Sequence, residues 1–99
     1  MTELMTPTER ILTVIRSFPC LQRKLKNWNP KTFEPEQFLA MTSGWSHGER
    51  LCADFVLNVW NPGEARAKGW TFDFMEFAGT ADPGSRQALL RWLMDPCWP

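Results

Sequence analysis

The chain has 99 residues, of which 43% are hydrophobic and 22% charged, and its 11 basic residues balance its 11 acidic ones. This composition excludes a disordered chain, which combines low hydrophobicity with high net charge, and it excludes nucleic-acid binding through bulk positive charge. No apolar run approaches the roughly 18 residues that cross a membrane, and residues 1–16 lack the pattern of a secretory signal. We therefore expect one cytoplasmic domain spanning residues 1–99.

The first predicted helix covers residues 7–17. Thr6 is positioned to cap it, Pro7 suits its first turn, and Glu9 completes a capping box. Apolar residues then recur with the spacing of one helical face, at Ile11, Val14, Ile15 and Phe18.

A second helix is predicted at residues 19–28, since Pro19 can open it and Asn29-Pro30 disfavours helical backbone. Its apolar face consists of Leu21, Leu25 and Trp28. Pro35 opens a third helix, which the Thr42-Ser43-Gly44 segment ends.

The fourth predicted helix is the most apolar part of the chain. Ser46 and Glu49 form a second capping box at its start, and Asn61-Pro62-Gly63 ends it. A helix that is apolar on most sides is usually buried, so this one should form the centre of the fold. Its apolar residues are Leu51, Cys52, Ala53, Phe55, Val56, Leu57, Val59 and Trp60.

Residues 61–69 are predicted to be a loop, and residues 70–78 fit either a strand or a helix. Trp70, Phe72 and Phe74 alternate as in a strand, whereas Phe74, Phe77 and Ala78 fit a helical face. A strand here would have no partner strand elsewhere in the sequence, so we favour a short helix.

The last predicted helix begins after Asp82-Pro83 and ends at Asp95-Pro96, with Leu89, Trp92 and Leu93 facing the core. Together these segments predict an all-α fold, a compact bundle of five to six short helices.

The sequence offers few residues for catalysis or metal binding. Cys20, Cys52 and Cys97 are odd in number and far apart, which is typical of reduced thiols rather than of a disulfide scaffold. No Cys-x2-Cys pair is present to begin a zinc site. His47, the only histidine, does not share a helix face with Cys52. We expect no catalytic residues, no metal and no cofactor.

One segment, residues 16–31, carries five basic residues and no acidic one. Three interpretations stay open: a solvated face balanced by Glu34 and Glu36, a contact with an acidic protein surface, or a contact with nucleic acid. Trp28 lies within the segment, and tryptophan is enriched at binding hot spots. The candidate binding residues are Arg23, Lys24, Lys26, Trp28 and Lys31.

The chain contains six tryptophans, which are hard to bury completely in a small domain. We expect one or two of them to be substantially exposed.

The C-terminal half resembles small uncharacterised proteins carried by phages and prophages. The resemblance begins at Gly48-Glu49-Arg50 and runs through Val59-Trp60-Asn61, Phe72-Asp73, Asp82, Arg86, Trp92-Leu93 and Pro96-x-Trp98-Pro99. It implies a protein that acts by binding and blocking a host protein, as anti-CRISPR proteins do. Because the chain is neutral, the resemblance implies a steric or allosteric mode rather than DNA mimicry.

These observations predict a non-enzymatic protein-interaction module, a phage-type accessory protein that binds and inhibits or modulates a host protein complex. The alternative is a small nucleic-acid-associated helical domain that uses residues 16–31. A small enzyme is the third class considered, and a steep loss of affinity with salt would distinguish nucleic-acid contacts from protein contacts.

Overall fold

A computed structural model describes residues 5–99; residues 1–4, which begin the predicted 1–99 domain, lie outside the described residues. The described part contains helices and no strand, so the predicted all-α class is confirmed. It contains seven helices rather than the expected five or six: α1 (Pro7–Ser17), α2 (Pro19–Lys24), α3 (Pro35–Met41), α4 (His47–Trp60), α5 (Pro62–Ala67), α6 (Phe74–Thr80) and α7 (Pro83–Met94).

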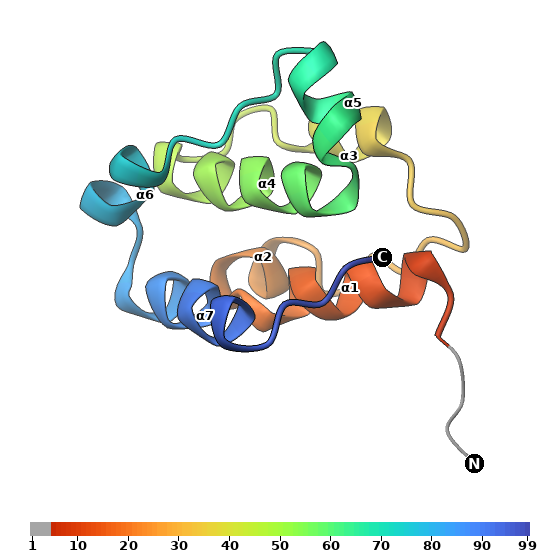
Figure 1. Cartoon of the computed structure of the whole chain (residues 1–99), viewed down its shortest axis with the longest axis horizontal. Helices are drawn as coiled ribbons and strands as arrows, with labels where there is room; N and C mark the ends of the chain where they lie inside the picture. The colour runs from red at the N-terminus through yellow and green to blue at the C-terminus, as the bar shows by residue number, and fades with distance from the viewer. Residues whose placement is uncertain (1–4) are drawn as a thin grey trace.

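The helices are arranged around α4 (Figure 1). On one side of α4 lie α1, α2 and α7, and on the other side lie α3 and α5, with α6 near the start of α4. Helix α4 contacts α1, α2, α3, α5 and α6 directly, and α2 also contacts α7. The sequence prediction that α4 is the centre of the fold is therefore confirmed.

Both predicted capping boxes are present. At α1 the Thr6 hydroxyl accepts from the Glu9 backbone N–H at 3.1 Å, and the Glu9 carboxylate accepts from the Thr6 N–H at 2.7 Å. At α4 Ser46 and Glu49 make the same reciprocal pair, at 3.3 and 2.9 Å. Each box satisfies backbone donors that the first turn of a helix leaves unpaired.

The second helix is shorter than predicted, since α2 ends at Lys24 and not at residue 28. Leu25 adopts a non-helical backbone, and the Trp28 N–H bonds to the Leu25 carbonyl in a following turn. The Asn29-Pro30 signal therefore marks the end of this turn, beyond the end of the helix.

The segment predicted as a loop at residues 61–69 contains helix α5. Asn61 ends α4 and also caps α5, because its side-chain oxygen accepts from the Glu64 N–H at 3.0 Å. Pro62 fits the first turn, and Ala65 is fully buried. The Asn-Pro-Gly sequence is thus both a stop and a start signal, and the predicted loop rests on the stop signal alone.

The choice of a helix within residues 70–78 is confirmed for α6, which begins at Phe74 after Asp73 caps it. The residues before it, 70–73, have no strand partner among the described residues. The Trp70 carbonyl instead accepts a bond from the Asn58 side chain of α4 at 2.8 Å.

The core consists of apolar side chains from six of the helices and the connecting segments. Phe55 is only 6% exposed, and its ring packs against Phe18, Phe72 and Trp92 at centroid distances of 5.5, 5.4 and 5.2 Å. Trp98 is substantially exposed, at 52%, and the other five tryptophans are half-buried. The prediction that one or two tryptophans are substantially exposed is therefore confirmed. Among residues 5–99, no helix combines the length and apolarity needed to cross a membrane.

Helix α7 differs from its prediction in one respect. Leu89 is buried and Trp92 is half-buried, as expected, but Leu93 is 51% exposed and does not belong to the core face. The inward face is completed by smaller residues, Ser85 and Ala88. These small side chains bring α7 close to the core without needing Leu93.

Candidate functional site

The basic segment, residues 16–31, runs from the end of α1 through α2 into the following loop. Its five basic side chains are all exposed. Lys24 forms an ion pair with Glu49 at the start of α4, with 3.7 Å between Nζ and Oε1. Arg16 donates to the side-chain oxygen of Asn29 at 3.3 Å. Arg16 and Lys26 therefore line one crevice with Trp28, whereas Arg23 lines a different hollow and Lys24 has an acidic residue next to it.

Trp28, the predicted anchor of this segment, is half-buried. Its ring packs against Phe33 and Phe38 at centroid distances of 6.2 and 5.8 Å. It also lines a small crevice of about 80 Å³, whose lining includes Arg16 and Lys26. Most of the Trp28 ring thus contributes to packing. A role for the remaining edge in binding stays a prediction.

A second surface, which the sequence analysis did not single out, lies on α6 and α7. Five large apolar side chains are more than half exposed there, and we call them the α6–α7 apolar face: Phe74, Met75, Leu90, Leu93 and Met94. Met75 and Met94 are the most exposed, at 76% and 85%. Contiguous exposed apolar patches are uncommon on monomeric proteins and often mark interaction sites.

A groove of about 250 Å³ runs between the two helices of this face. Its walls include Phe74 and Ala78 of α6 and Pro83 and Leu90 of α7. The charged side chain among its described lining residues is Arg86, which donates to the Ala81 carbonyl at 2.8 Å and is held against the groove. The groove is therefore apolar, with a positive charge at a defined position.

The sequence contained a signal for this face. Pro83, Arg86, Gln87 and Leu90 follow one another at helical spacing on a stripe that continues through Leu93 and Met94. The stripe was missed because Leu93 was assigned to the core together with Leu89 and Trp92. A helix with apolar residues on two faces needs the tertiary structure to show which face is covered.

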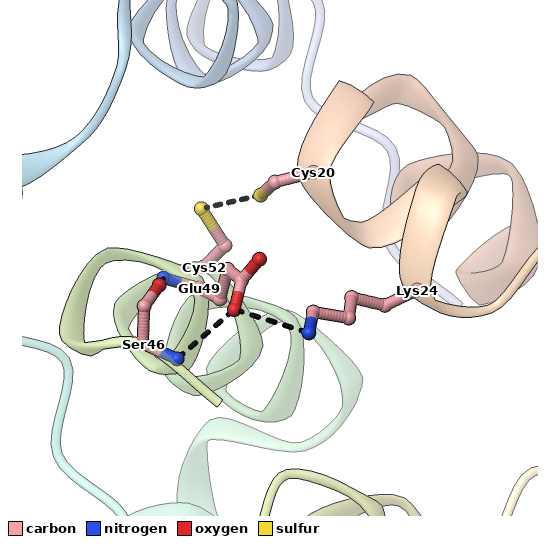
Figure 2. Close-up of polar contacts among 5 residues, drawn as sticks. All are labelled: Cys20, Lys24, Ser46, Glu49 and Cys52. Carbon is pink, nitrogen blue, oxygen red and sulfur yellow. Dashed lines mark hydrogen bonds and ion pairs between the residues drawn. The ribbon is translucent and has the colours of Figure 1, made fainter. Parts of the chain in front are cut away.

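A third cluster lies where α2, α4 and α7 meet (Figure 2). The Glu49 carboxylate accepts from the Ser46 N–H and pairs with Lys24, and these contacts, the Ser46 bond first, lower the pKa of Glu49 below its usual range. His47, in the first turn of α4, is largely exposed, and its Nε2 lies 3.4 Å from Glu76 Oε1.

Cys20 of α2 and Cys52 of α4 point toward one another in this cluster, with 3.5 Å between their Sγ atoms (Figure 2). Their wide spacing in the sequence gave no indication of this contact, because helix packing brings together residues 32 positions apart. The Ser85 hydroxyl of α7 lies 3.4 Å from the Cys20 Sγ and donates to Asp82 at 2.5 Å. All three cysteines are free thiols, as predicted.

The structure also bears on metal binding. Within residues 5–99, no group of three or more histidine, cysteine, aspartate or glutamate side chains is arranged to hold a metal ion. Cys97 is half-buried near the C-terminus, and its backbone carbonyl accepts from the Trp92 indole at 3.1 Å.

Comparisons with known proteins give no further assignment. No family model, curated protein or solved structure matches this chain.

Proposed function

We propose that this protein is a non-enzymatic protein-interaction module that holds an amphipathic helix of a partner protein on the α6–α7 apolar face. The observation that carries the proposal is an apolar groove lined by the exposed Phe74 and Leu90, on two helices that also expose Met75, Leu93 and Met94. Apolar side chains one turn apart on a partner helix fit such a groove, and recognition of this kind is common.

The charge of the groove narrows the class of partner. Arg86 provides a positive charge beside apolar walls, and its bond to the Ala81 carbonyl restricts its position. A partner helix with an acidic side chain next to its apolar face would pair with this guanidinium. An acidic protein partner is one of the three interpretations that the sequence left open, and the proposal assigns its contact to a surface other than the basic segment.

The resemblance to small phage and prophage proteins supports a biological setting for the module. In that setting the protein is a cytoplasmic accessory protein that binds and inhibits or modulates a host protein complex. The basic segment, with Arg23, Lys24, Lys26 and Lys31 exposed, then steers the encounter with an acidic surface, since peripheral charges mainly change association rates.

Nucleic-acid binding through the basic segment is the second candidate function. The exposed basic side chains favour it. However, Trp28 packs against Phe33 and Phe38, so its ring offers little surface for base stacking. Lys24 also forms an ion pair with Glu49, which reduces the positive charge available to a phosphate. We therefore rank this function second.

The test starts from affinity capture in extracts of the organism that encodes the protein, followed by purification of the captured protein and measurement of direct binding. The double change Leu90→Asp/Met94→Asp places charges on the apolar face. We expect it to weaken binding at least about tenfold. Gln37→Asp/Ser43→Asp adds the same charge at exposed positions on α3 and just after it, away from both surfaces, and serves as the matched control.

Three results would contradict the proposal. The first is equal binding by the wild type and the apolar-face variant. The second is capture of nucleic acid, bound with an affinity that falls steeply with salt and that is weakened by Lys24→Glu/Lys26→Glu but not by the apolar-face variant. The third is a wild-type dimer in solution that the apolar-face variant abolishes, since the face would then be covered by a second copy of the chain.

A further inference from the structure

Two of the three thiols are positioned for chemistry that protein binding does not use. Cys20 lies in the first turn of α2 and Cys52 in the middle of α4, and both side chains are nearly inaccessible, at 4% and 1% exposure. Their Sγ atoms are 3.5 Å apart. A disulfide has an S–S bond of about 2.05 Å, so an approach of about 1.5 Å would join them.

Cys20 lies at the wall of a hollow that is open to the surface. It lines a hollow of about 480 Å³ between α2, the start of α4 and the segment joining α6 to α7, together with Arg23, Ser46, His47 and Asp82. A reagent of the size of hydrogen peroxide fits this space. Cys52 is not among the residues that line the hollow.

The two thiols are also unequal in acidity. Once Cys20 loses its proton, the Cys52 thiol can donate a hydrogen bond to the thiolate, and this contact is the main cause that lowers the pKa of Cys20 to about 7. The same pairing, together with burial, raises the pKa of Cys52. A thiolate is the nucleophilic form of cysteine, so Cys20 is the more reactive of the two.

We propose that Cys20 and Cys52 form an oxidisable dithiol, in which a hydroperoxide entering the hollow converts the pair into an intramolecular disulfide. The Cys20 thiolate attacks one peroxide oxygen, an S–O bond forms, the O–O bond breaks, and hydroxide leaves and is protonated to water. Cys52 Sγ then attacks the Cys20 sulfenic sulfur and gives up its proton as the S–O oxygen leaves as water. Two thiols are oxidised and one peroxide is reduced.

The disulfide would join α2 to α4 at the position where Lys24 and Glu49 already pair (Figure 2). It would hold the helix that carries Arg23 and Lys24 against the central helix of the fold. This inference is independent of the α6–α7 apolar face, which lies on other helices.

The experiment treats the fully reduced, folded wild-type protein with a small molar excess of hydrogen peroxide and then labels remaining thiols with an alkylating reagent after denaturation. We expect the intact mass to fall by two hydrogen atoms and one thiol to be labelled rather than three. Peptide mapping should find Cys20 linked to Cys52 and the label on Cys97.

Two comparisons sharpen the test. Cys97→Ser should form the same disulfide at the wild-type rate. In Cys52→Ala, the Cys20 sulfenic acid should persist long enough to be trapped by dimedone. Oxidation of the pair in the folded protein should also be at least about tenfold faster than in concentrated guanidinium, because the fold holds the thiols together.

The proposal is overturned if all three thiols of the folded wild type remain labelled while a free thiol peptide in the same solution is oxidised. It is also overturned if the disulfide formed involves Cys97, or if folded and unfolded chains react at the same rate. These readouts use the wild-type protein, so an unstable cysteine variant would not affect them.

Discussion

Helices α4 and α7 are both rich in apolar residues, but the fold covers only one of them. Seven residues of α4 are buried, and neighbouring helices contact it on several sides. Three residues of α7 are buried, while Leu90, Leu93 and Met94 face outward. The apolar residues of α4 are therefore explained by folding alone. Those on the outer side of α7 require a different explanation, and binding to another protein is the one proposed above.

The largest expected effect concerns the centre of α4. Phe55→Ala should lower the free energy of unfolding by about 3–5 kcal/mol, because it removes a ring packed between Phe18, Phe72 and Trp92. Urea denaturation followed by circular dichroism measures this loss. A cost below about 1 kcal/mol would show that α4 is not the centre of the core and would remove the contrast with α7.

Helices α4 and α7 also differ at their N-terminal caps. Ser46 caps α4 through its hydroxyl, whereas the Asp82 side chain before α7 makes no capping bond to the backbone and accepts from the buried Ser85 hydroxyl. Ser46→Ala should cost about 1 kcal/mol, within the range measured for lost N-caps. Ser46→Asp is the control, since aspartate also caps and should restore most of the stability. Equal losses in both variants would contradict a capping role.

A carboxyl on α4 should make part of the stability depend on pH. Burial raises the pKa of Asp54 from 3.8 to about 6, against the opposing effects of Arg50 and His47. Because the folded-state pKa is the higher one, ionised Asp54 destabilises the fold, fully above about pH 6 and not at all below about pH 4.

Asp54→Asn should therefore stabilise the protein near pH ~7.5 by on the order of 1 kcal/mol, after allowance for partial solvent exposure. The gain should shrink as the pH falls from about 6 to about 4. Denaturation of both proteins across this range measures the difference. A difference that is constant with pH would mean that the Asp54 carboxyl titrates normally.

The fold could be predicted from the sequence where its signals are local. Caps such as Thr6/Glu9 and Ser46/Glu49 depend on residues within one turn, and both helix starts were correctly located. Helix α5 was missed because Asn61 ends one helix and caps the next, so a single signal had two meanings.

The surfaces were harder to predict, because they depend on which helices meet. Nothing local to Leu93 shows that Ser85 and Ala88, rather than Leu93, face the core. Likewise, nothing in the separate surroundings of Cys20 and Cys52 shows that α2 and α4 place their sulfurs together. By contrast, the charge asymmetry of residues 16–31 was visible in sequence, although the ion pair between Lys24 and Glu49 was not.

The smallest expected effect is that of Leu90→Ala on α7, and its contrast with Leu57→Ala on α4 is the most direct test of the comparison between the two helices. Leu57 of α4 is 1% exposed and Leu90 of α7 is 54% exposed, so the same change to alanine can be made on both helices. Leu57→Ala should cost about 2–5 kcal/mol. Leu90→Ala should change the free energy of unfolding by less than about 0.5 kcal/mol, since it removes little buried area and alanine favours a helix.

Both measurements should be made at several protein concentrations, because a face covered by a second copy would make stability concentration-dependent. If Leu90→Ala costs more than about 1 kcal/mol at all concentrations, Leu90 supports the fold and the contrast between α4 and α7 fails. If the cost is negligible while the same variant weakens partner binding, Leu90 has a role in recognition and none in stability. That separation is what distinguishes an interaction face from an incompletely covered core.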